Sequence, residues 1–209
     1  MSKRTIQKYM RRARRPRPSG QRWATFLQNH SGQIWTCDFL HTYDVLFRPI
    51  FAFFIVALGS REVVWFNVTR SPTTASVSQQ LRNATPWREE PRFLIRNNDD
   101  RFGTLFDRVA DTTGIRVLRT PVQASRANAV CERFLGSVRR ECLDHLLILG
   151  ERHFHSVLTE YVNYVNHARP HQVLRQEIPL GVGHPSTAHG RVVGFPVLGG
   201  LHHDYRRAA

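Results

Sequence analysis

Acidic residues and lysine are scarce in this sequence. Its 209 residues include 30 basic side chains against 16 acidic ones, which gives a formal charge of +14 and a pI near 11.2. Only Lys3 and Lys8 are lysines, so arginine carries nearly all of the positive charge. Arginine binds phosphate through a planar fork, although a GC-rich coding bias produces the same excess of arginine. A surface this basic usually faces a polyanion, with nucleic acid the first candidate and an anionic membrane the second.

Cysteines and long apolar runs are scarce as well. Cys37, Cys131 and Cys142 have no paired spacing, which argues against a disulfide framework and against a zinc site. The longest apolar run covers residues 49–60, and its 12 residues fall short of the roughly 20 that a membrane helix needs. We therefore expect a buried strand there. Because no charged and apolar leader opens the chain, we predict a cytoplasmic protein.

The positive charge is concentrated at the start of the chain. Residues 1–22 contain two lysines, seven arginines and no acid, which accounts for +9 of the total charge. Their pattern is compatible with a helix, since Ile6 and Met10 stand at i and i+4, and equally with a disordered basic arm. Either form would contact phosphate without reading a base sequence. We predict DNA contacts from four arginines of this arm: Arg11, Arg12, Arg14 and Arg15.

The rest of the chain has the pattern of an α/β protein. Three consecutive runs rich in β-branched and aromatic residues predict an antiparallel meander, after which strands alternate with helices. The predicted strands cover 33–42, 47–60, 61–69, 91–99 and 115–121, and the predicted helices cover 71–86, 103–114, 126–142 and 153–171. This order describes a mixed five-stranded sheet flanked by helices.

Three segments follow from these patterns. Residues 1–22 form the basic arm, and residues 23–177 form one core of a size usual for a single domain. Residues 178–209 are rich in glycine and histidine and have no clear period. We expect this last segment to be extended or loosely ordered.

Several acidic residues stand where a metal site could form. Asp38 lies inside an otherwise apolar strand, where an unpaired carboxylate is expensive to bury. Asp99 and Asp100 follow another predicted strand, and Glu132 lies about 200° from Phe134 around its helix. Taken singly, each is ordinary for a turn or a solvated helix face. Together, on a very basic protein, they favour one or two Mg²⁺ ions that also bind a substrate phosphate.

Four motifs occur in a characteristic order: "WTCDFLHT", "FLIRNNDDRFG", "RTPVQASRANAVCERFLGSVRREC" and "VNHARPHQVL". From about Trp23 to about Pro179 they resemble the catalytic core of bacterial insertion-sequence transposases of the DDE type, relatives of retroviral integrases. The resemblance implies an RNase H-like fold. It also implies that two divalent ions, Mg²⁺ or Mn²⁺, bracket a phosphate of double-stranded DNA during cleavage and strand transfer.

The resemblance gives roles to particular positions. It implies that Asp38 is the first acid of the metal site and Glu132 the last. Counting back from Glu132, with 34 residues between, places the family's second acid at Asn97. The implied catalytic and metal-binding residues are therefore Asp38, Asn97 and Glu132. Asp99 is a candidate substitute, but in an extended strand it would lie about 6.6 Å from residue 97 at about 3.3 Å per residue, too far for a simple exchange.

Asn97 is the main departure from the family pattern. An amide lacks the negative charge that helps to hold two dications, and Mg²⁺ sites favour carboxylates. We therefore predict DNA binding with severely reduced or absent cleavage. One alternative is a catalytically inactive DNA-binding remnant or inhibitor that joins the assembly of an active relative. Another is an RNase H-like nuclease acting on RNA–DNA hybrids. The motifs "ANAVCERF" and "RPH" argue against this alternative.

The resemblance also predicts partners. Arg139, one heptad after Glu132, matches a basic position from which a phosphate contact is expected, and Arg140 stands beside it. Three further residues match recurrent positions with roles more structural than catalytic: Asn128, Arg169 and His171. Because recombination joins DNA ends, we expect self-association on transposon-end and target DNA, at the bacterial nucleoid and not at a membrane. Relatives carry a helix-turn-helix region before the core, and residues 2–10 match only its last helix.

Overall fold

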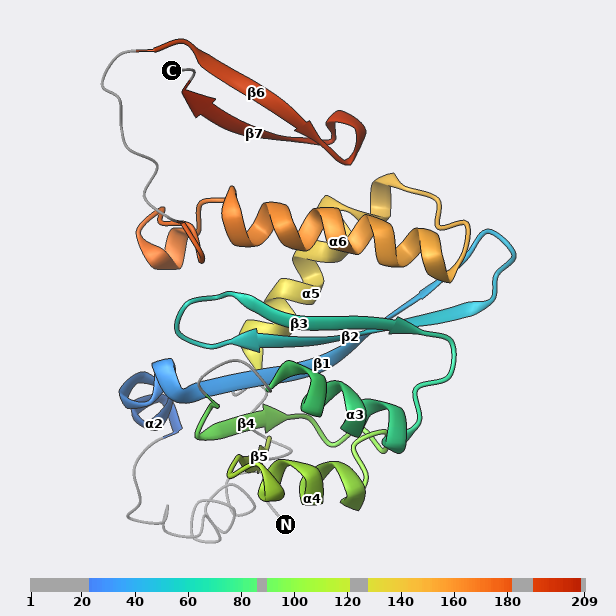
Figure 1. Ribbon diagram of the computed structural model, residues 1–209, viewed down its shortest axis with the longest axis vertical. Helices are drawn as coiled ribbons and strands as arrows, with labels where there is room; N and C mark the ends of the chain where they lie inside the picture. Colours follow the sequence, from blue (N-terminus) through green and yellow to red (C-terminus); the bar gives the residue numbers. More distant parts are fainter. Residues whose placement is uncertain (1–22, 86–89, 121–127, 182–189, 208–209) are drawn as a thin grey trace, which may run out of the picture.

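A mixed five-stranded sheet forms the centre of the described chain (Figure 1). The computed structural model describes residues 23–85, 90–120, 128–181 and 190–207. The strands are β1 (Ile34–Tyr43), β2 (Pro49–Ala57), β3 (Val63–Thr69), β4 (Phe93–Arg96) and β5 (Arg116–Arg119), in the order β3-β2-β1-β4-β5. The first three are antiparallel, whereas β4 runs parallel to β1 and β5 runs parallel to β4. This confirms the predicted sheet with its three antiparallel strands first.

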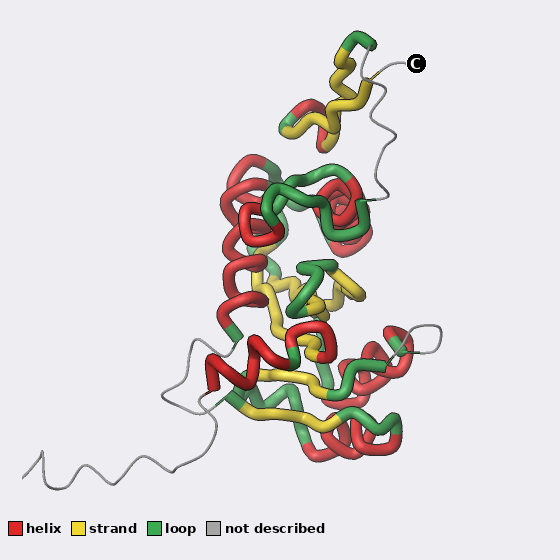
Figure 2. The backbone as a smooth tube through the Cα atoms, turned by 90° about the vertical axis from the view of Figure 1, so that its left-hand side faces the viewer, coloured by secondary structure: helices red, strands yellow, loops and turns green. Residues whose placement is uncertain are grey.

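Helices lie on both sides of the strands, as the turned view shows (Figure 2). They are α2 (Trp23–Asn29), α3 (Thr74–Ala84), α4 (Thr104–Thr112), α5 (Ala129–Glu141) and α6 (Glu151–His167). Short 3₁₀ turns cover Ser31–Gln33, Leu143–His145, Gln172–Leu174 and Leu198–Gly200. A capping box starts α3, because the Thr73 hydroxyl accepts the Ser76 N–H at 3.2 Å and the Ser76 hydroxyl accepts the Thr73 N–H at 3.0 Å. None of the described helices has the length and apolarity to cross a membrane.

The two faces of the sheet bury separate apolar clusters. Side chains alternate along a strand, so β1 and β2 contribute to both. On the α5–α6 side the rings of Phe54 and Phe134 pack edge to face, 5.1 Å apart. On the α3–α4 side Phe53, Phe102 and Phe106 form a second cluster. Asp38 and Leu40 share the α5 side of β1, which puts the buried carboxylate of Asp38 against the start of α5.

The strand predicted over 91–99 is shorter than expected, because β4 ends at Arg96. The Asn97 side-chain oxygen accepts the Asp99 N–H at 3.0 Å, and an Asp99 carboxylate oxygen accepts the Arg101 N–H at 2.9 Å. Such side-chain to backbone bonds turn the chain away from a strand. The predicted spacing between residues 97 and 99, which assumed an extended strand, therefore does not apply.

The prediction of a loosely ordered C-terminal segment was wrong for residues 190–207. These residues form a hairpin of β6 (Val192–Val197) and β7 (His202–Arg207). Leu198 is buried at its tip, and the Leu198 N–H donates to the Glu160 carboxylate on α6. The His202 ring stacks on Tyr164 of α6, with centroids 5.0 Å apart. No strand pattern is visible in these residues, because the hairpin is mostly exposed and its position depends on contacts with a distant helix.

Candidate catalytic site

Asp38 lies in the middle of β1 with both carboxylate oxygens already accepting hydrogen bonds. One oxygen accepts the backbone N–H of Phe39 at 2.7 Å and the side-chain N–H of Asn97 at 2.9 Å. The other accepts the side-chain N–H of Asn128 at 3.1 Å. Only 9% of Asp38 is exposed, and it forms no salt bridge with a described residue. Amide N–H groups therefore stand where a cation is expected beside a buried carboxylate.

The pKa of Asp38 is raised from 3.8 to about 6. Burial is the main cause, since it disfavours the charged form. The Phe39 N–H lowers this pKa, the charges of Glu132 and Asp99 raise it, and the Asn97 hydrogen bond lowers it. Because Glu132 and Asp99 act on Asp38 in this way, both carboxylates lie within electrostatic range of it.

The Asn97 side chain has an orientation fixed by partners at both ends. Its oxygen accepts the Asp99 N–H, so its nitrogen must be the atom that faces Asp38. The backbone of Asn97 is held as well, because the Arg96 guanidinium donates to the Asn97 carbonyl at 3.0 Å. Arg96 is itself buried and forms a salt bridge with Asp107 at 2.9 Å. Asn97 is thus positioned as a hydrogen-bond donor toward Asp38.

Glu132 and Arg139 occupy exposed positions on α5, seven residues apart. The Glu132 N–H donates to the Asn128 carbonyl at 3.0 Å, which begins the hydrogen-bonding of α5 directly above Asp38. Arg139 donates to the His41 carbonyl of β1 at 2.9 Å. One helix therefore carries an acid and a base along the side of β1 that holds Asp38.

These residues do not fit a centre of two divalent ions. Both oxygens of Asp38 accept N–H donors, and the Asn97 side chain presents to Asp38 an N–H group, which cannot bind a cation. Within residues 23–85, 90–120, 128–181 and 190–207, no group of three His, Cys, Asp or Glu side chains is arranged to hold a metal ion. Hard dications require oxygen ligands, preferably carboxylates, and only Asp38 and Glu132 remain of the implied acid set.

Two sequence comparisons agree with the motifs. Residues 113–179 match the family model described as "Integrase core domain", a stretch that includes Asn128 and Glu132. A protein of insertion element IS476 from Xanthomonas euvesicatoria, described as an uncharacterized 39.2 kDa protein, is 26% identical over 165 residues, covering 78% of this chain and 48% of the relative. Residues 113–179 are thus similar to an integrase core domain. It spans about half the length of that curated relative.

Solved structures similar to this chain show the same RNase H-like fold. The chain in the intasome of simian T-cell lymphotropic virus, in complex with PP2A regulatory subunit B56 gamma, has a TM-score of 0.60 at 14% identity, covering 83% of this chain and 66% of that one. The catalytic core domain of BIV integrase has a TM-score of 0.54 at 14% identity, covering 71% and 91%. The dimeric HTLV-2 integrase core in complex with magnesium also has a TM-score of 0.54, at 12% identity, covering 74% and 97%.

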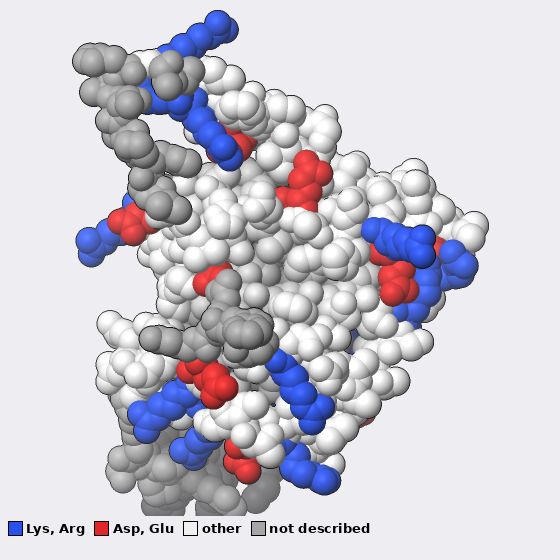
Figure 3. Space-filling model, viewed as in Figure 1, with Lys and Arg blue, Asp and Glu red and all other residues white. Residues whose placement is uncertain are grey.

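The predicted DNA-binding arginines are divided between two parts of the chain. Arg139 and Arg140 are exposed in the last turn of α5, about two turns beyond Glu132. The arginines of the basic arm lie outside the described residues: Arg11, Arg12, Arg14 and Arg15. On the face seen in Figure 3, basic side chains stand beside acidic ones and form no continuous basic surface. The concentration of positive charge in residues 1–22 is therefore a feature of the sequence, and the described residues on this face do not repeat it.

Two contacts of the site escaped the sequence patterns. Asn128 matched a recurrent position with an expected structural role, but its contact with Asp38 across 90 residues of chain was not predicted. The motif "ANAVCERF" was the available signal for it. Arg96 lies in the motif "FLIRNNDDRFG", but its salt bridge with Asp107 was not predicted, since an aspartate early in a helix is ordinary. Their salt bridge fixes the segment that presents Asn97.

Proposed function

We propose that this chain is a DDE-type transposase core that binds double-stranded DNA, and that Asn97 impairs its strand cleavage and strand transfer. The observation that supports this is the hydrogen bond of 2.9 Å from the Asn97 side-chain nitrogen to Asp38. In an intact site of this type, Asp38, Glu132 and a carboxylate at position 97 would hold divalent ions, which would supply activation of the attacking oxygen and stabilisation of the leaving oxygen. In this chain position 97 instead donates an N–H to Asp38.

The proposed DNA surface follows α5. Arg139 and Arg140 are exposed about two turns beyond Glu132 on the same helix, so a duplex that reached Asp38 and followed α5 would meet these guanidinium groups. The basic arm adds sequence-independent attraction to phosphate. The similar structures include an intasome and a dimeric integrase core, which supports the proposal that this chain assembles into an oligomer on DNA.

Exchange of Asn97 for aspartate tests the proposal. The parent, Asn97→Asp and the matched control Asn98→Asp are compared for nicking of supercoiled plasmid with Mn²⁺ or EDTA. Asn98 is exposed and donates to the Thr120 carbonyl at 3.2 Å, so the control adds the same charge one residue away. We expect Asn97→Asp to nick in Mn²⁺ at a rate at least 100-fold above the parent and the control.

A second substitution assigns that activity to the site. Asp38→Ala combined with Asn97→Asp should return nicking to the parental rate. Asn97→Asp that nicks no faster than the parent would show that position 97 is not the second ligand position.

A catalytically inactive DNA-binding protein or inhibitor is the second candidate. It is favoured by the three N–H donors that the two Asp38 oxygens accept from the chain itself. A Mn²⁺ titration separates the two candidates. Saturable binding that Asp38→Ala abolishes indicates a residual metal site, whereas equal affinity in both proteins indicates a binding role alone. Cleavage of RNA–DNA hybrids in preference to duplex DNA by Asn97→Asp would instead favour an RNase H-like nuclease.

A further inference from the structure

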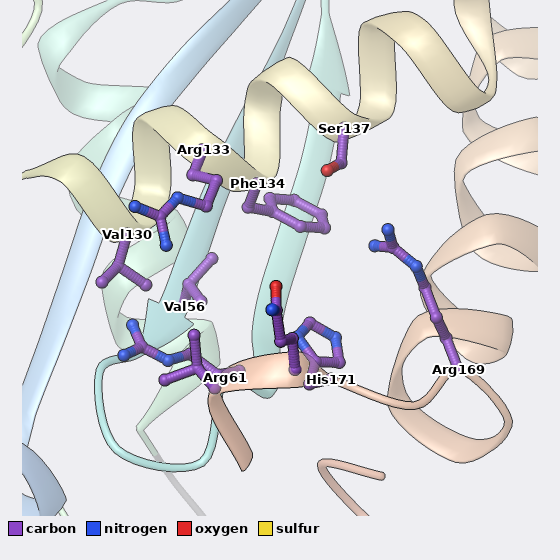
Figure 4. Close-up of a pocket in the computed structure, with 10 residues that line it drawn as sticks. Val56, Arg61, Val130, Arg133, Phe134, Ser137, Arg169 and His171 are labelled. Atoms are coloured by element: carbon purple, nitrogen blue, oxygen red, sulfur yellow. The ribbon is translucent and has the colours of Figure 1, made fainter. Parts of the chain in front are cut away.

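A pocket lies on the side of α5 that faces away from Glu132. It has a volume of about 170 Å³ and opens between α5, the turn that joins β2 to β3, and the segment after α6 (Figure 4). Val130 and Phe134 of α5 form an apolar wall. The remaining wall is cationic, and its basic residues come from three separate segments: Arg61, Arg133, Arg169 and His171.

The positive charge of this pocket is only partly neutralised. Arg169 forms a salt bridge with Glu141 at 2.5 Å, and Glu141 also accepts the Tyr161 hydroxyl at 2.9 Å. Arg61 and Arg133 form no salt bridge with any residue of the described ranges. Burial, followed by the charge of Arg133, lowers the pKa of Arg61. Two guanidinium groups therefore repel each other across one pocket.

Two buried nitrogen atoms at the pocket have no hydrogen-bond partner. They are Nε of Arg61 and Nε2 of His171. Buried polar atoms are almost always paired in folded proteins, so an unpaired one points to a ligand that the protein alone does not supply. Burial, with the charges of Arg169 and Arg61, lowers the pKa of His171. An anion in the pocket would oppose that effect and offer an acceptor to N–H groups at these positions.

The backbone at Arg61 adds a separate observation. Its φ is +63°, in the left-handed region that a large side chain rarely adopts. Residues held in such conformations concentrate at binding sites, where the surrounding structure maintains them. Figure 4 shows Arg61 and Arg133 approaching from the β2–β3 turn and from α5, with Arg169 on the opposite side. The unfavourable turn conformation thus brings a guanidinium group into the pocket.

We propose that this pocket binds a phosphate group. A phosphate has five heavy atoms, and the volume equals that of roughly five to six water molecules at about 30 Å³ each. Guanidinium forks match its oxygens with paired, charge-assisted hydrogen bonds, and the apolar wall of Val130 and Phe134 limits competition from water. The phosphate can belong to a DNA strand, which rests on the proposed function, or to a free phosphate compound, which does not.

Inorganic phosphate is the first probe, measured by calorimetry in low-chloride buffer. We compare the parent with Arg133→Gln, Arg133→Lys and the double variant Arg61→Gln/Arg133→Gln, and use Arg116→Gln as the matched control. Arg116 is exposed on β5 and lines no part of this pocket. We expect Arg133→Gln to weaken phosphate binding at least tenfold, the double variant to abolish it, and Arg133→Lys to lie between because it keeps the charge without the fork.

Duplex DNA is the second probe, with affinity measured against salt concentration. If Arg133→Gln weakens duplex binding and lowers the slope of log K against log salt by about 0.9, the bound phosphate belongs to DNA. If duplex affinity is unchanged while phosphate affinity falls, the ligand is a free phosphate compound. Both outcomes support the pocket.

The phosphate site is wrong if the parent shows no phosphate binding, or if Arg116→Gln weakens it as much as Arg133→Gln does. Phosphate affinity that survives in the double variant also overturns it. Unfolding midpoints of all variants show whether each is folded. Because Asn97 takes no part in these measurements, failure of the phosphate site leaves the nicking test intact, and failure of the nicking test leaves the phosphate site intact.

Discussion

Two charged regions of opposite sign lie on either side of helix α5. On one side, the buried Asp38 carboxylate is satisfied from within the chain by Asn97, Asn128 and a backbone N–H. On the other side, Arg61 and Arg133 share a pocket without a neutralising carboxylate in the described chain. The polar partners of the first region come from the chain itself. The second has kept the features of a site that is completed by an external anion.

The largest expected effect comes from restoring a carboxylate beside Asp38. In EDTA at pH 8, Asn97→Asp removes a hydrogen bond to a charged group and adds repulsion, so we expect the free energy of unfolding to fall by roughly 3 kcal/mol. Mn²⁺ at 100 times its dissociation constant should raise the free energy of unfolding of this variant again by about 2.7 kcal/mol. Chemical denaturation with and without Mn²⁺ measures both. A variant as stable as the parent in EDTA would mean that the hydrogen bond from Asn97 does not stabilise the Asp38 carboxylate.

Asp38→Asn should remove a pH dependence of stability. The pKa of Asp38 is raised from 3.8 to about 6, so its charged form destabilises the fold above pH 6, and this destabilisation fades as pH falls to 3.8. A difference of about 2.2 units corresponds to about 3 kcal/mol. We expect Asp38→Asn to be more stable than the parent at pH 8 by up to that amount and equally stable near pH 4, in metal-free buffer. The unpaired Asn128 side-chain oxygen can accept the new amide N–H once that side chain flips.

Denaturation curves from pH 4 to pH 8 check this second prediction. Glu132→Gln serves as the control, because Glu132 is exposed and raises the pKa of Asp38 only through its charge. Glu132→Gln should shift slightly the pH at which stability changes, and the pH dependence itself should remain. A parent and an Asp38→Asn variant with the same dependence on pH would contradict the raised pKa.

The sequence predicted the sheet far better than it predicted either region beside α5. The strands β1, β2 and β3 are long, apolar runs whose pattern depends on local residues, so their order and antiparallel pairing were predictable. The turn at Asn97 was not predictable, because it forms when the Asn97 side chain, rather than a neighbouring strand, accepts the Asp99 N–H. The hairpin β6–β7 was missed because its position depends on Glu160 and Tyr164 of α6.

The cationic pocket was the least predictable feature. Arg61 lies more than 70 residues before Arg133, and both are unremarkable members of a sequence with many arginines. The motif "RPH" marked Arg169 and His171 as recurrent positions, but it did not reveal that they face Arg61 across a pocket. Spacing along one helix or strand cannot report a site assembled from three segments.

Arg133→Gln should have a smaller effect on stability, with a sign that depends on phosphate. In phosphate-free buffer it removes repulsion with Arg61, and we expect a gain of about 0.5 kcal/mol because Arg133 is exposed and its charge is screened. With phosphate present, the parent gains stability from binding and the variant gains less, so their order should reverse. Denaturation at several phosphate concentrations measures the crossover. Parallel curves for the two proteins would contradict a role of Arg133 in binding the anion.

The smallest expected effect is that of Arg139→Gln on duplex binding. Arg139 is exposed and already donates to the His41 carbonyl, so a DNA phosphate must share or replace that hydrogen bond. We expect duplex affinity at low salt to fall roughly threefold and the salt slope to fall by about 0.9, with no change in inorganic phosphate binding. Arg152→Gln, an exposed arginine of α6, is the control and should leave both unchanged. If Arg139→Gln weakened binding of inorganic phosphate as well, the two sides of α5 would not be independent, and the contrast between a hydrogen-bonded carboxylate and a separate anion pocket would fail.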